Sequence, residues 1–309
     1  MAQNNEICLS IHDLASLFQQ DQKTTYEELK KICGPQRSVQ YILPETVRKF
    51  IYAKGLRIPS KVISFQMLKG GVAKTTSALN FGIRASMYGA RVLFIDLDQQ
   101  ANLTFALLMN GEEAETRPVW VDILEKKAKI QDVRMSLPAG VDLIPSNLNN
   151  SVLDRVLLNG QRNWAQAVQM YLKEIRAEYD LVIIDTAPNL SAINTAVTCA
   201  SDLVVLPINP DKFSLLGVRK NLSDLNELEK EFNLSLQKKI LFTKFDGRES
   251  LSKEILALAI EEFEGLLMEN YVRSSTDIKN VVGEKKNLFS TKSNAKEDYD
   301  QVTKELLEF

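Results

Sequence analysis

Six short apolar runs, rich in β-branched side chains, recur along the chain from residue 61 onward. They read KVISFQM, RVLFID, VDLIPS, DLVIIDTAP, DLVVLPIN and KKILFTKF. Nearly continuous apolar runs, rather than alternating ones, are typical of strands covered on both faces, as in a parallel sheet flanked by helices. The intervening segments are long enough for right-handed helical crossovers. The pattern therefore predicts one α/β domain with a doubly wound, mostly parallel sheet over residues 61–309.

The first 60 residues follow a different pattern. Three short helical segments, LSIHDLASLF, TYEELKKIC and PETVRKFIYAKG, are separated by Gly34-Pro35 and end near Pro59. A basic edge accompanies the third segment and consists of Arg48, Lys49, Lys54, Arg57 and Lys61. Such helices suit a helix-turn-helix-like module that reads DNA. They suit equally well a helical cap or a dimerisation arm, so both interpretations of residues 1–60 stay open.

Composition excludes several classes of protein. Cys8, Cys33 and Cys199 have no CxxC spacing, so neither a disulfide framework nor a structural zinc site is expected. The opening MAQNNEICLS lacks the pattern of a signal peptide, and no run approaches the ~18 apolar residues of a membrane span. We therefore expect a cytoplasmic protein. The formal net charge of −2 leaves room for a local basic face.

A glycine-rich turn joins the first apolar run to a helical pattern that stops at Gly89, where a left-handed cap is expected. The turn reads LKGGVAKTT over residues 68–76. Its glycines let backbone N–H groups line a concavity that fits a triphosphate, and the helix N-terminus adds partial positive charge. Lys74 is expected to contact the β- and γ-phosphates, and the Thr75 hydroxyl to ligate Mg²⁺. A chance glycine-rich turn is the alternative, but the strand–turn–helix context favours a P-loop.

Two acidic residues follow later strand-like runs. Asp98 comes after RVLFID, and Asp185 closes DLVIID. Phosphoryl transfer depends on positioning and on charge stabilisation, and Asp98 could orient the attacking water. A lone charge at the end of an apolar strand is costly, which argues for a functional Asp185. Either residue could instead be a solvated acid in a turn.

These motifs, in this order, resemble the ParA/MinD family of deviant Walker ATPases over residues 61–309. The family loop KGGVGKT corresponds to KGGVAKTT, which makes Lys69 the signature lysine that reaches the partner's nucleotide across an ATP-sandwich dimer. FIDLDQQANLT resembles the DxDPQGN switch and gives Asp98 the role of positioning water. DLVIIDTAP gives Asp185 the role of holding Mg²⁺ through water. INPDKFSLLG and LFTKFDGRESL resemble the nucleotide-base and C-terminal blocks of partitioning ATPases.

The resemblance implies an ATPase with ATP and Mg²⁺ as cofactors and an ATP-dependent homodimer. The implied catalytic residues are Lys69, Lys74 and Asp98, and the implied magnesium ligands are Thr75, Asp98 and Asp185. The implied nucleotide-binding residues are Lys69, Gly70, Gly71, Val72, Ala73, Lys74, Thr75, Thr76, Asn209, Pro210 and Asp211.

Three residues depart from the family pattern. Ala73 replaces the glycine before the catalytic lysine, Gln99 replaces a proline, and Ala101 replaces a glycine of the switch. The Ala73 methyl lies where the backbone approaches phosphate. Slower turnover is one reading. The other is lost nucleotide binding, which would leave a degenerate scaffold.

The implied function is DNA partitioning of a plasmid or chromosome, or positioning of another cargo. Weak basal hydrolysis would be stimulated by DNA and by a ParB-like partner, in a cytoplasmic protein associated with the nucleoid. Candidate residues for non-specific DNA binding are Arg219, Lys220, Arg248 and Lys253. Contacts to phosphates alone are weak and salt-sensitive.

A membrane-bound, MinD-like positioning ATPase is the alternative within the family. Its membrane helix is basic, whereas the tail AKEDYDQVTKELLEF is acidic and would be repelled by anionic lipid. A role like that of nitrogenase reductase is disfavoured, because no cysteine pair suits a shared iron–sulfur cluster.

Overall fold

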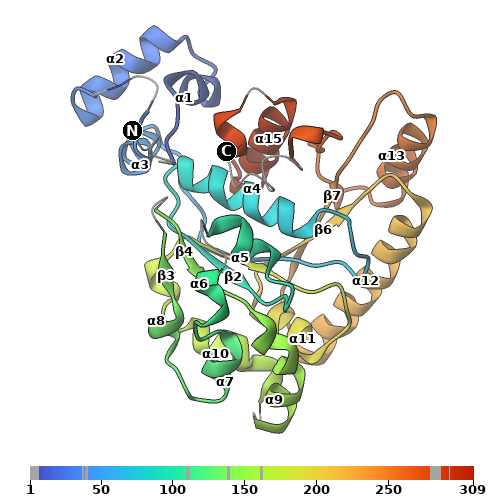
Figure 1. The fold of residues 1–309 in the computed structure, drawn as a ribbon. Coiled ribbons are helices and arrows are strands. Elements are labelled where there is room, and N and C mark those ends of the chain that lie inside the picture. The colour runs from blue at the N-terminus through green and yellow to red at the C-terminus, as the bar shows by residue number, and fades with distance from the viewer. Residues whose placement is uncertain are drawn as a thin grey trace.

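A seven-stranded sheet forms the centre of the protein (Figure 1). The computed structural model describes residues 7–36, 38, 41–108, 112–137, 140–160, 163–278, 287–291 and 293–309. The strand order is β3-β4-β2-β5-β1-β6-β7, and every neighbouring pair is parallel except β3 and β4. The strands are β1 Lys61–Phe65, β2 Val92–Asp96, β3 Met135–Ser136, β4 Asp142–Ile144, β5 Leu181–Asp185, β6 Leu203–Ile208 and β7 Gln237–Phe242. The predicted doubly wound sheet is confirmed, and the six apolar runs are six of its strands.

Helices cover both faces of this sheet, as the continuous apolar runs require. Alternate residues of β1 face opposite sides: Ile63 packs in one buried cluster with α4 and α15, and Val62 packs in another with α7, α9, α10 and α11. A third cluster joins β6 and β7 to α12 and α13. The helices of the sheet domain are α4 Lys74–Met87, α5 Asn102–Leu107, α6 Glu112–Glu115, α7 Trp120–Leu124, α8 Ile130–Val133, α9 Leu153–Gly160, α10 Ala167–Leu172, α11 Ala192–Ala200, α12 Lys212–Phe232, α13 Ser250–Glu262 and α15 Asn294–Leu307.

Two glycines fix the position of α4 on the sheet. A Cβ atom at Gly82 would overlap the ring of Phe94 on β2 and would lie 2.6 Å from the Ile183 side chain on β5. Gly89, just after the helix, has φ +93°, so the left-handed cap expected there is confirmed. Its absent side chain also leaves room for the backbone of α3, whose Pro44 carbonyl oxygen would lie 2.7 Å from a Cβ.

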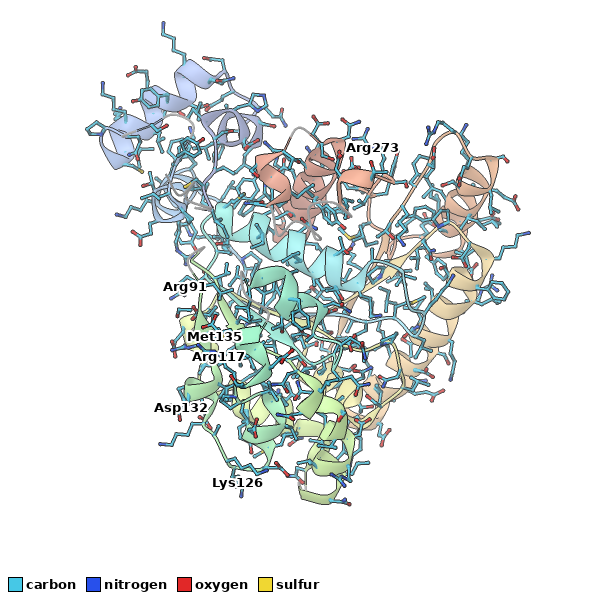
Figure 2. All side chains as sticks on the ribbon, in the orientation of Figure 1. Arg91, Arg117, Lys126, Asp132, Met135 and Arg273 are labelled. Carbon is cyan, nitrogen blue, oxygen red and sulfur yellow. The ribbon has the colours of Figure 1, made fainter. Side chains whose placement is uncertain are left out.

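The N-terminal segment consists of α1 Ile11–Leu17, α2 Gln22–Cys33 and α3 Pro44–Ala53, and it packs beside α4 and α15 (Figure 1). Val47 and Phe50 of α3 lie fully buried in the same apolar cluster as Phe81 of α4. Arg48 donates to the Asp180 carboxylate at 2.5 and 3.0 Å, next to the start of β5. Arg91, labelled in Figure 2, donates to the same carboxylate at 3.2 Å. Apolar burial and this shared carboxylate together hold the segment on the sheet domain.

A buried charge cluster joins the two ends of the chain to α4. Arg84 of α4 is 1% exposed, and its Nε donates to Asp300 of α15 at 2.7 Å. The Tyr88 hydroxyl donates to the same oxygen at 2.7 Å, and Asp13 of α1 lies 3.5 Å from the guanidinium. Because a buried charge is stable only when it is paired, the Arg84 cluster fixes the positions of α1, α4 and α15 relative to one another.

Candidate phosphate-binding and catalytic site

The predicted phosphate loop opens onto a cleft at the carboxyl ends of β1, β2 and β5, the edge where open α/β sheets bind ligands. The cleft has a volume of roughly 720 Å³. The loop and α4 contribute Gly70, Gly71, Ala73, Lys74, Thr75, Thr76 and Leu79. The connection after β2 contributes Asp98, Gln99, Gln100, Asn102, Phe105 and Ala106, and the connection after β5 contributes Ala187, Pro188 and Asn189. Three segments far apart in the sequence thus form one concave site.

The loop backbone takes a left-handed conformation at two positions, Gly71 with φ +74° and Ala73 with φ +69°. Ala73 is the N-terminal cap of α4. An L-residue in this region costs about 1–2 kcal/mol relative to glycine, so the surrounding fold imposes the conformation. Thr243 donates to the Val72 carbonyl at 3.2 Å, and Lys244 donates to the Gly71 carbonyl at 2.6 Å. These contacts from the end of β7 hold the loop in a shape suited to an anion.

Lys74 is the buried cation of the cleft, with 7% of its surface exposed. Burial lowers the pKa of its ammonium group, and the nearby carboxylates of Asp185 and Asp98 partly offset that effect. A buried ammonium beside anion-binding amides is suited to neutralise phosphate oxygens.

Asp185, at the end of β5, accepts a hydrogen bond from the Thr75 hydroxyl at 2.6 Å through Oδ2. Its Oδ1 is buried and receives no donor from the residues that the structure describes. Burial, and secondarily the charge of Asp96, raise the pKa of Asp185 to about 8. A buried carboxylate oxygen without a donor is costly in a site of this kind. The donor set of hydroxyl and carboxylate therefore fits Mg²⁺ or its coordinated water.

Asp96 and Asp98 organise the connection after β2. Asp96 is fully buried, and it accepts from the Thr104 amide at 2.9 Å, the Thr104 hydroxyl at 2.8 Å and the Asp98 amide at 3.1 Å. Burial raises the pKa of Asp96 well above its ordinary value. Asp98 lines the cleft and accepts from the Gln100 amide at 2.9 Å. Sequence reasoning gave no role to Thr104, although it is the last residue of the recognised FIDLDQQANLT motif.

The second predicted lysine, Lys69, is not among the residues that line this cleft. Its Nζ lies 2.5 Å from Oδ2 of Asp211 and 3.4 Å from the Ser214 hydroxyl. Asp211 also caps α12 by accepting from the Ser214 amide at 2.9 Å. The structure thus brings Asp211 to Lys69. The predicted nucleotide- and metal-site residues that are not among those lining the cleft are Lys69, Val72, Asp185, Asn209, Pro210 and Asp211. This pairing across 142 residues has no sequence signal.

The four predicted DNA-binding residues lie exposed on α12, on α13 and on the connection between β7 and α13. Arg219 of α12 pairs with Glu262 of α13 at 2.7 Å, and Arg248 pairs with Asp246 at 2.6 Å. Lys220 pairs with Asp224 at 2.5 Å. Exposed ion pairs of this kind contribute little to stability, so these cations can exchange partners.

The acidic tail AKEDYDQVTKELLEF belongs largely to α15, which packs against α4. Val302, Leu306 and Leu307 on its apolar face are buried in the cluster shared with α4. Among the residues that the structure describes, no helix has both the length and the apolar character needed to span a bilayer.

Comparisons with known proteins match this description. The family model described as an AAA domain matches residues 60–238. A ParA family protein of Chlamydia muridarum is 30% identical over 256 residues, which cover 80% of this chain and 97% of that protein. The sporulation initiation inhibitor protein Soj of Bacillus subtilis is 29% identical over 198 residues, which cover 63% of this chain and 77% of Soj.

Solved structures share the fold at lower identity. A variant of McdA from Cyanothece, in complex with ATP, has a TM-score of 0.72 and 23% identity, covering 82% of this chain and 98% of that one. Cobyrinic acid a,c-diamide synthase of Mycobacterium smegmatis, with a bound ATP analogue and magnesium, has a TM-score of 0.70 and 24% identity, covering 81% and 95%. A plasmid partition protein of Borrelia burgdorferi has a TM-score of 0.60 and 22% identity, covering 80% and 98%.

Proposed function

Because the chain belongs to the ParA/MinD family of P-loop ATPases, we propose that it hydrolyses ATP with Mg²⁺ and acts as a switch in partitioning or positioning a cargo. In this proposal ATP binding drives dimerisation, and the dimer binds DNA without sequence preference. Basal hydrolysis is weak and is stimulated by DNA and by a ParB-like protein. Such a cycle operates at the nucleoid.

One observation carries the ATPase proposal. Asp185 presents a buried oxygen that has no donor among the described residues, beside the hydroxyl of Thr75, and both Thr75 and the buried Lys74 line the cleft. A buried carboxylate that lacks a donor, next to a buried lysine, is costly to the fold, and a degenerate scaffold would gain no function in return for that cost. The charges needed to bind a triphosphate are therefore retained despite Ala73.

The residues divide the chemistry of hydrolysis among them. The loop amides and Lys74 bind the phosphates, and Thr75 and Asp185 would hold Mg²⁺, which supplies positive charge at the β- and γ-phosphate oxygens. Asp98 orients the attacking water from the opposite wall of the cleft, where the backbone N–H of Gln100 fixes its carboxylate. Gln99, Gln100 and Asn189 line the same walls and offer amide groups to the γ-phosphate.

Lys69 is the residue that would link ATP binding to dimerisation. In the free chain its ammonium is held by Asp211, so it adds no charge to its own cleft. We propose that ATP-dependent pairing of two copies moves Lys69 onto the partner's nucleotide. Hydrolysis would then be coupled to assembly, which is the behaviour of a switch.

Calorimetric titration with ATP·Mg²⁺ tests the nucleotide site. Lys74→Ala should abolish binding, because it removes the buried charge that neutralises the β- and γ-phosphates. Lys126→Ala is the matched control, since that lysine is exposed at the far end of the molecule (Figure 2). Unchanged affinity in Lys74→Ala would mean that the nucleotide binds elsewhere.

The DNA proposal rests on the exposed cations of α12, of α13 and of the connection before α13, where Arg219, Lys220 and Arg248 would exchange carboxylate partners for phosphates. Filter binding of unrelated duplexes across a salt series should show ATP-dependent, sequence-independent binding that falls steeply with salt. Arg248→Ala and Lys253→Ala should each reduce the salt slope by about one, and Lys126→Ala should not. Binding that does not depend on ATP would contradict the proposal.

For residues 1–60 we propose a helical cap on the ATPase domain. Most of the predicted basic edge is engaged within the chain: Arg48 with Asp180, Lys54 with Glu28 and Lys61 with Glu308. The four-residue connection between α1 and α2 nevertheless has helix-turn-helix length. A strong preference for one duplex in the filter assay would favour that DNA-reading alternative.

A further inference from the structure

The wall of the cleft that carries Asp98 is held by one buried carboxylate. Asp96, the last residue of β2, accepts from the backbone N–H of Asp98 at 3.1 Å through Oδ1. Through Oδ2 it accepts from the backbone N–H of Thr104 at 2.9 Å and from the Thr104 hydroxyl at 2.8 Å. The connection over residues 97–103 is therefore bound at both ends to a side chain that is itself fully buried.

The hydroxyl of Thr104 bonds to two neighbours at once. It donates to Asp96, and it accepts from the backbone N–H of Ser146, just after β4, at 2.9 Å. Thr104 and Ser146 are both fully buried, so neither bond can be exchanged for one to bulk water. A hydroxyl can be donor and acceptor together, whereas a valine side chain has the same shape and can be neither.

Ser146 is in turn fixed to α7. Asn150 donates to the Ser146 hydroxyl at 2.8 Å, and its own Oδ1 accepts from the backbone N–H of Val121 in α7 at 3.2 Å. Ser146, Asn150 and Val121 are not among the residues that line the cleft. The Thr104 hydroxyl thus anchors the wall that carries Asp98 to elements outside the cleft.

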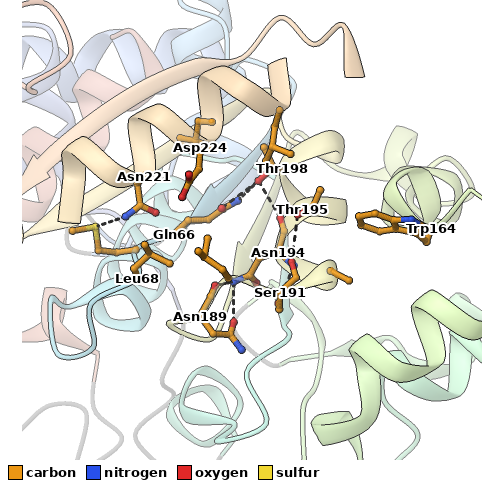
Figure 3. Close-up of a pocket in the computed structure, with 15 residues that line it drawn as sticks. Gln66, Leu68, Trp164, Asn189, Ser191, Asn194, Thr195, Thr198, Asn221 and Asp224 are labelled. Carbon is orange, nitrogen blue, oxygen red and sulfur yellow. Dashed lines mark hydrogen bonds between the residues drawn. The ribbon is translucent and has the colours of Figure 1, made fainter. Parts of the chain in front are cut away.

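The other walls of the cleft are held by different side chains (Figure 3). Asn194 of α11 donates to the carbonyl oxygen of Asn189 at 2.6 Å, which fixes the connection after β5. Gln66, which precedes the phosphate loop, donates to Thr198 of α11 at 3.1 Å. The bonds of Thr104 involve none of these groups. A change at Thr104 should therefore leave the phosphate-binding walls intact.

We propose that Thr104 is a positioning residue for hydrolysis, which holds the Asp98 carboxylate where it orients the attacking water. Asp98 is the group that touches the water, and Thr104 acts on it through the Asp96 carboxylate. A displacement of about 1 Å in such a group can cost a large factor in rate. The inference rests on the proposed ATPase function and adds a residue that hydrolysis requires and nucleotide binding does not.

Turnover and affinity of Thr104→Val test this role. Valine keeps the shape and the backbone N–H, but it removes the hydroxyl bonds to Asp96 and Ser146. The kcat for ATP should fall roughly tenfold or more, whereas the dissociation constant of ATP·Mg²⁺ should stay within about twofold of wild type. Thr104→Ser keeps the hydroxyl and should retain most of the wild-type kcat.

Thr303→Val is the matched control. Thr303 of α15 is also fully buried, and its hydroxyl donates to the Tyr299 carbonyl at 2.6 Å. Its substitution should lower the melting temperature, as Thr104→Val does, and leave kcat unchanged. Amide hydrogen exchange of the nucleotide-free protein is a readout that needs no ATP. Thr104→Val should speed exchange over residues 97–104, and Thr303→Val should not.

Wild-type kcat in Thr104→Val, or a parallel loss of kcat and ATP affinity, overturns the inference. Unchanged exchange over residues 97–104 does so as well. A tenfold fall of kcat in Thr104→Ser overturns it even if Thr104→Val does not fold. A wild type that binds ATP without hydrolysing it overturns the proposed function instead, and faster exchange in Thr104→Val would then report a structural role alone.

Discussion

Replacing Ala73 by glycine should stabilise the protein, which is the opposite of what this change does in most helices. Ala73 has φ +69° and ψ +29°, a conformation that costs an L-residue about 1–2 kcal/mol relative to glycine. The greater freedom of glycine in the unfolded chain removes about 0.4–1 kcal/mol of that gain. The expected net stabilisation is roughly 0.5–1 kcal/mol. Urea unfolding of the nucleotide-free protein measures it.

Two further variants make this test specific. Ala257 is exposed within α13, where glycine should destabilise the protein by about 1 kcal/mol. Ala101 has φ +53° at the start of α5 and should respond as Ala73 does. If Ala73→Gly destabilises the protein as much as Ala257→Gly, the left-handed backbone is not a source of strain and the reasoning fails.

The same substitution addresses turnover. The Ala73 methyl belongs to the wall of the cleft, where the loop approaches phosphate. Its removal should raise basal hydrolysis several-fold, which corresponds to roughly 1 kcal/mol in the barrier. Phosphate release under saturating ATP is the measurement. If affinity and turnover both stay unchanged, the methyl is accommodated and Ala73 has no functional consequence.

Three further predictions concern the acidic residues. Asp98→Ala should keep ATP binding and dimerisation but lose hydrolysis, which light scattering and phosphate release would show; turnover equal to wild type would refute its role. The pKa of Asp185 is raised from 3.8 to about 8, so its contribution to stability is complete below about pH 4 and is lost as pH rises through about 8 in metal-free protein. Asp185→Asn should therefore gain stability relative to wild type as pH rises over that range. Mg²⁺·ATP binding near neutral pH should release a proton, seen as buffer-dependent calorimetric heat. A stability difference between variant and wild type that does not change with pH would refute the assignment. Asp211→Asn, which preserves the cap of α12, should free Lys69 and increase the dimer fraction at a given ATP concentration; a decrease would show that Asp211 assists assembly instead.

The layout of the sheet could be predicted from the sequence because burial on both faces leaves a strong local pattern. The two-residue strand β3 escaped prediction, since an antiparallel edge strand of that length carries no periodicity. Gly82 and Gly89 show why α4 lies where it does, but only the predicted cap at Gly89 had a local signal.

In the candidate site, too, local sequence patterns predicted some residues, whereas tertiary packing alone determined others. Lys74, Thr75 and Asp98 were predictable because adjacent strand ends of a parallel sheet bring their connections to one edge. The pairing of Lys69 with Asp211 depends on tertiary packing, so no local pattern could indicate it. The same holds for Arg219, whose partner Glu262 lies on another helix. The left-handed backbone at Ala73 was also not predicted, because an alanine in the sequence does not indicate that conformation.

The buried cluster around Arg84 has a consequence for synthesis of the protein on the ribosome. Asp13 leaves the exit tunnel well before Asp300, which lies 216 residues after Arg84. The charge on Arg84 therefore lacks its Asp300 partner, and α1 lacks part of its docking surface, until α15 has been synthesised, whereas α3 can already pack on the sheet domain through Phe50 and the Arg48–Asp180 pair. Contacts that close over almost the whole length of a chain also slow folding. We expect ribosome-stalled chains that end before residue 294 to remain protease-sensitive in α1, and chains that include α15 to protect it.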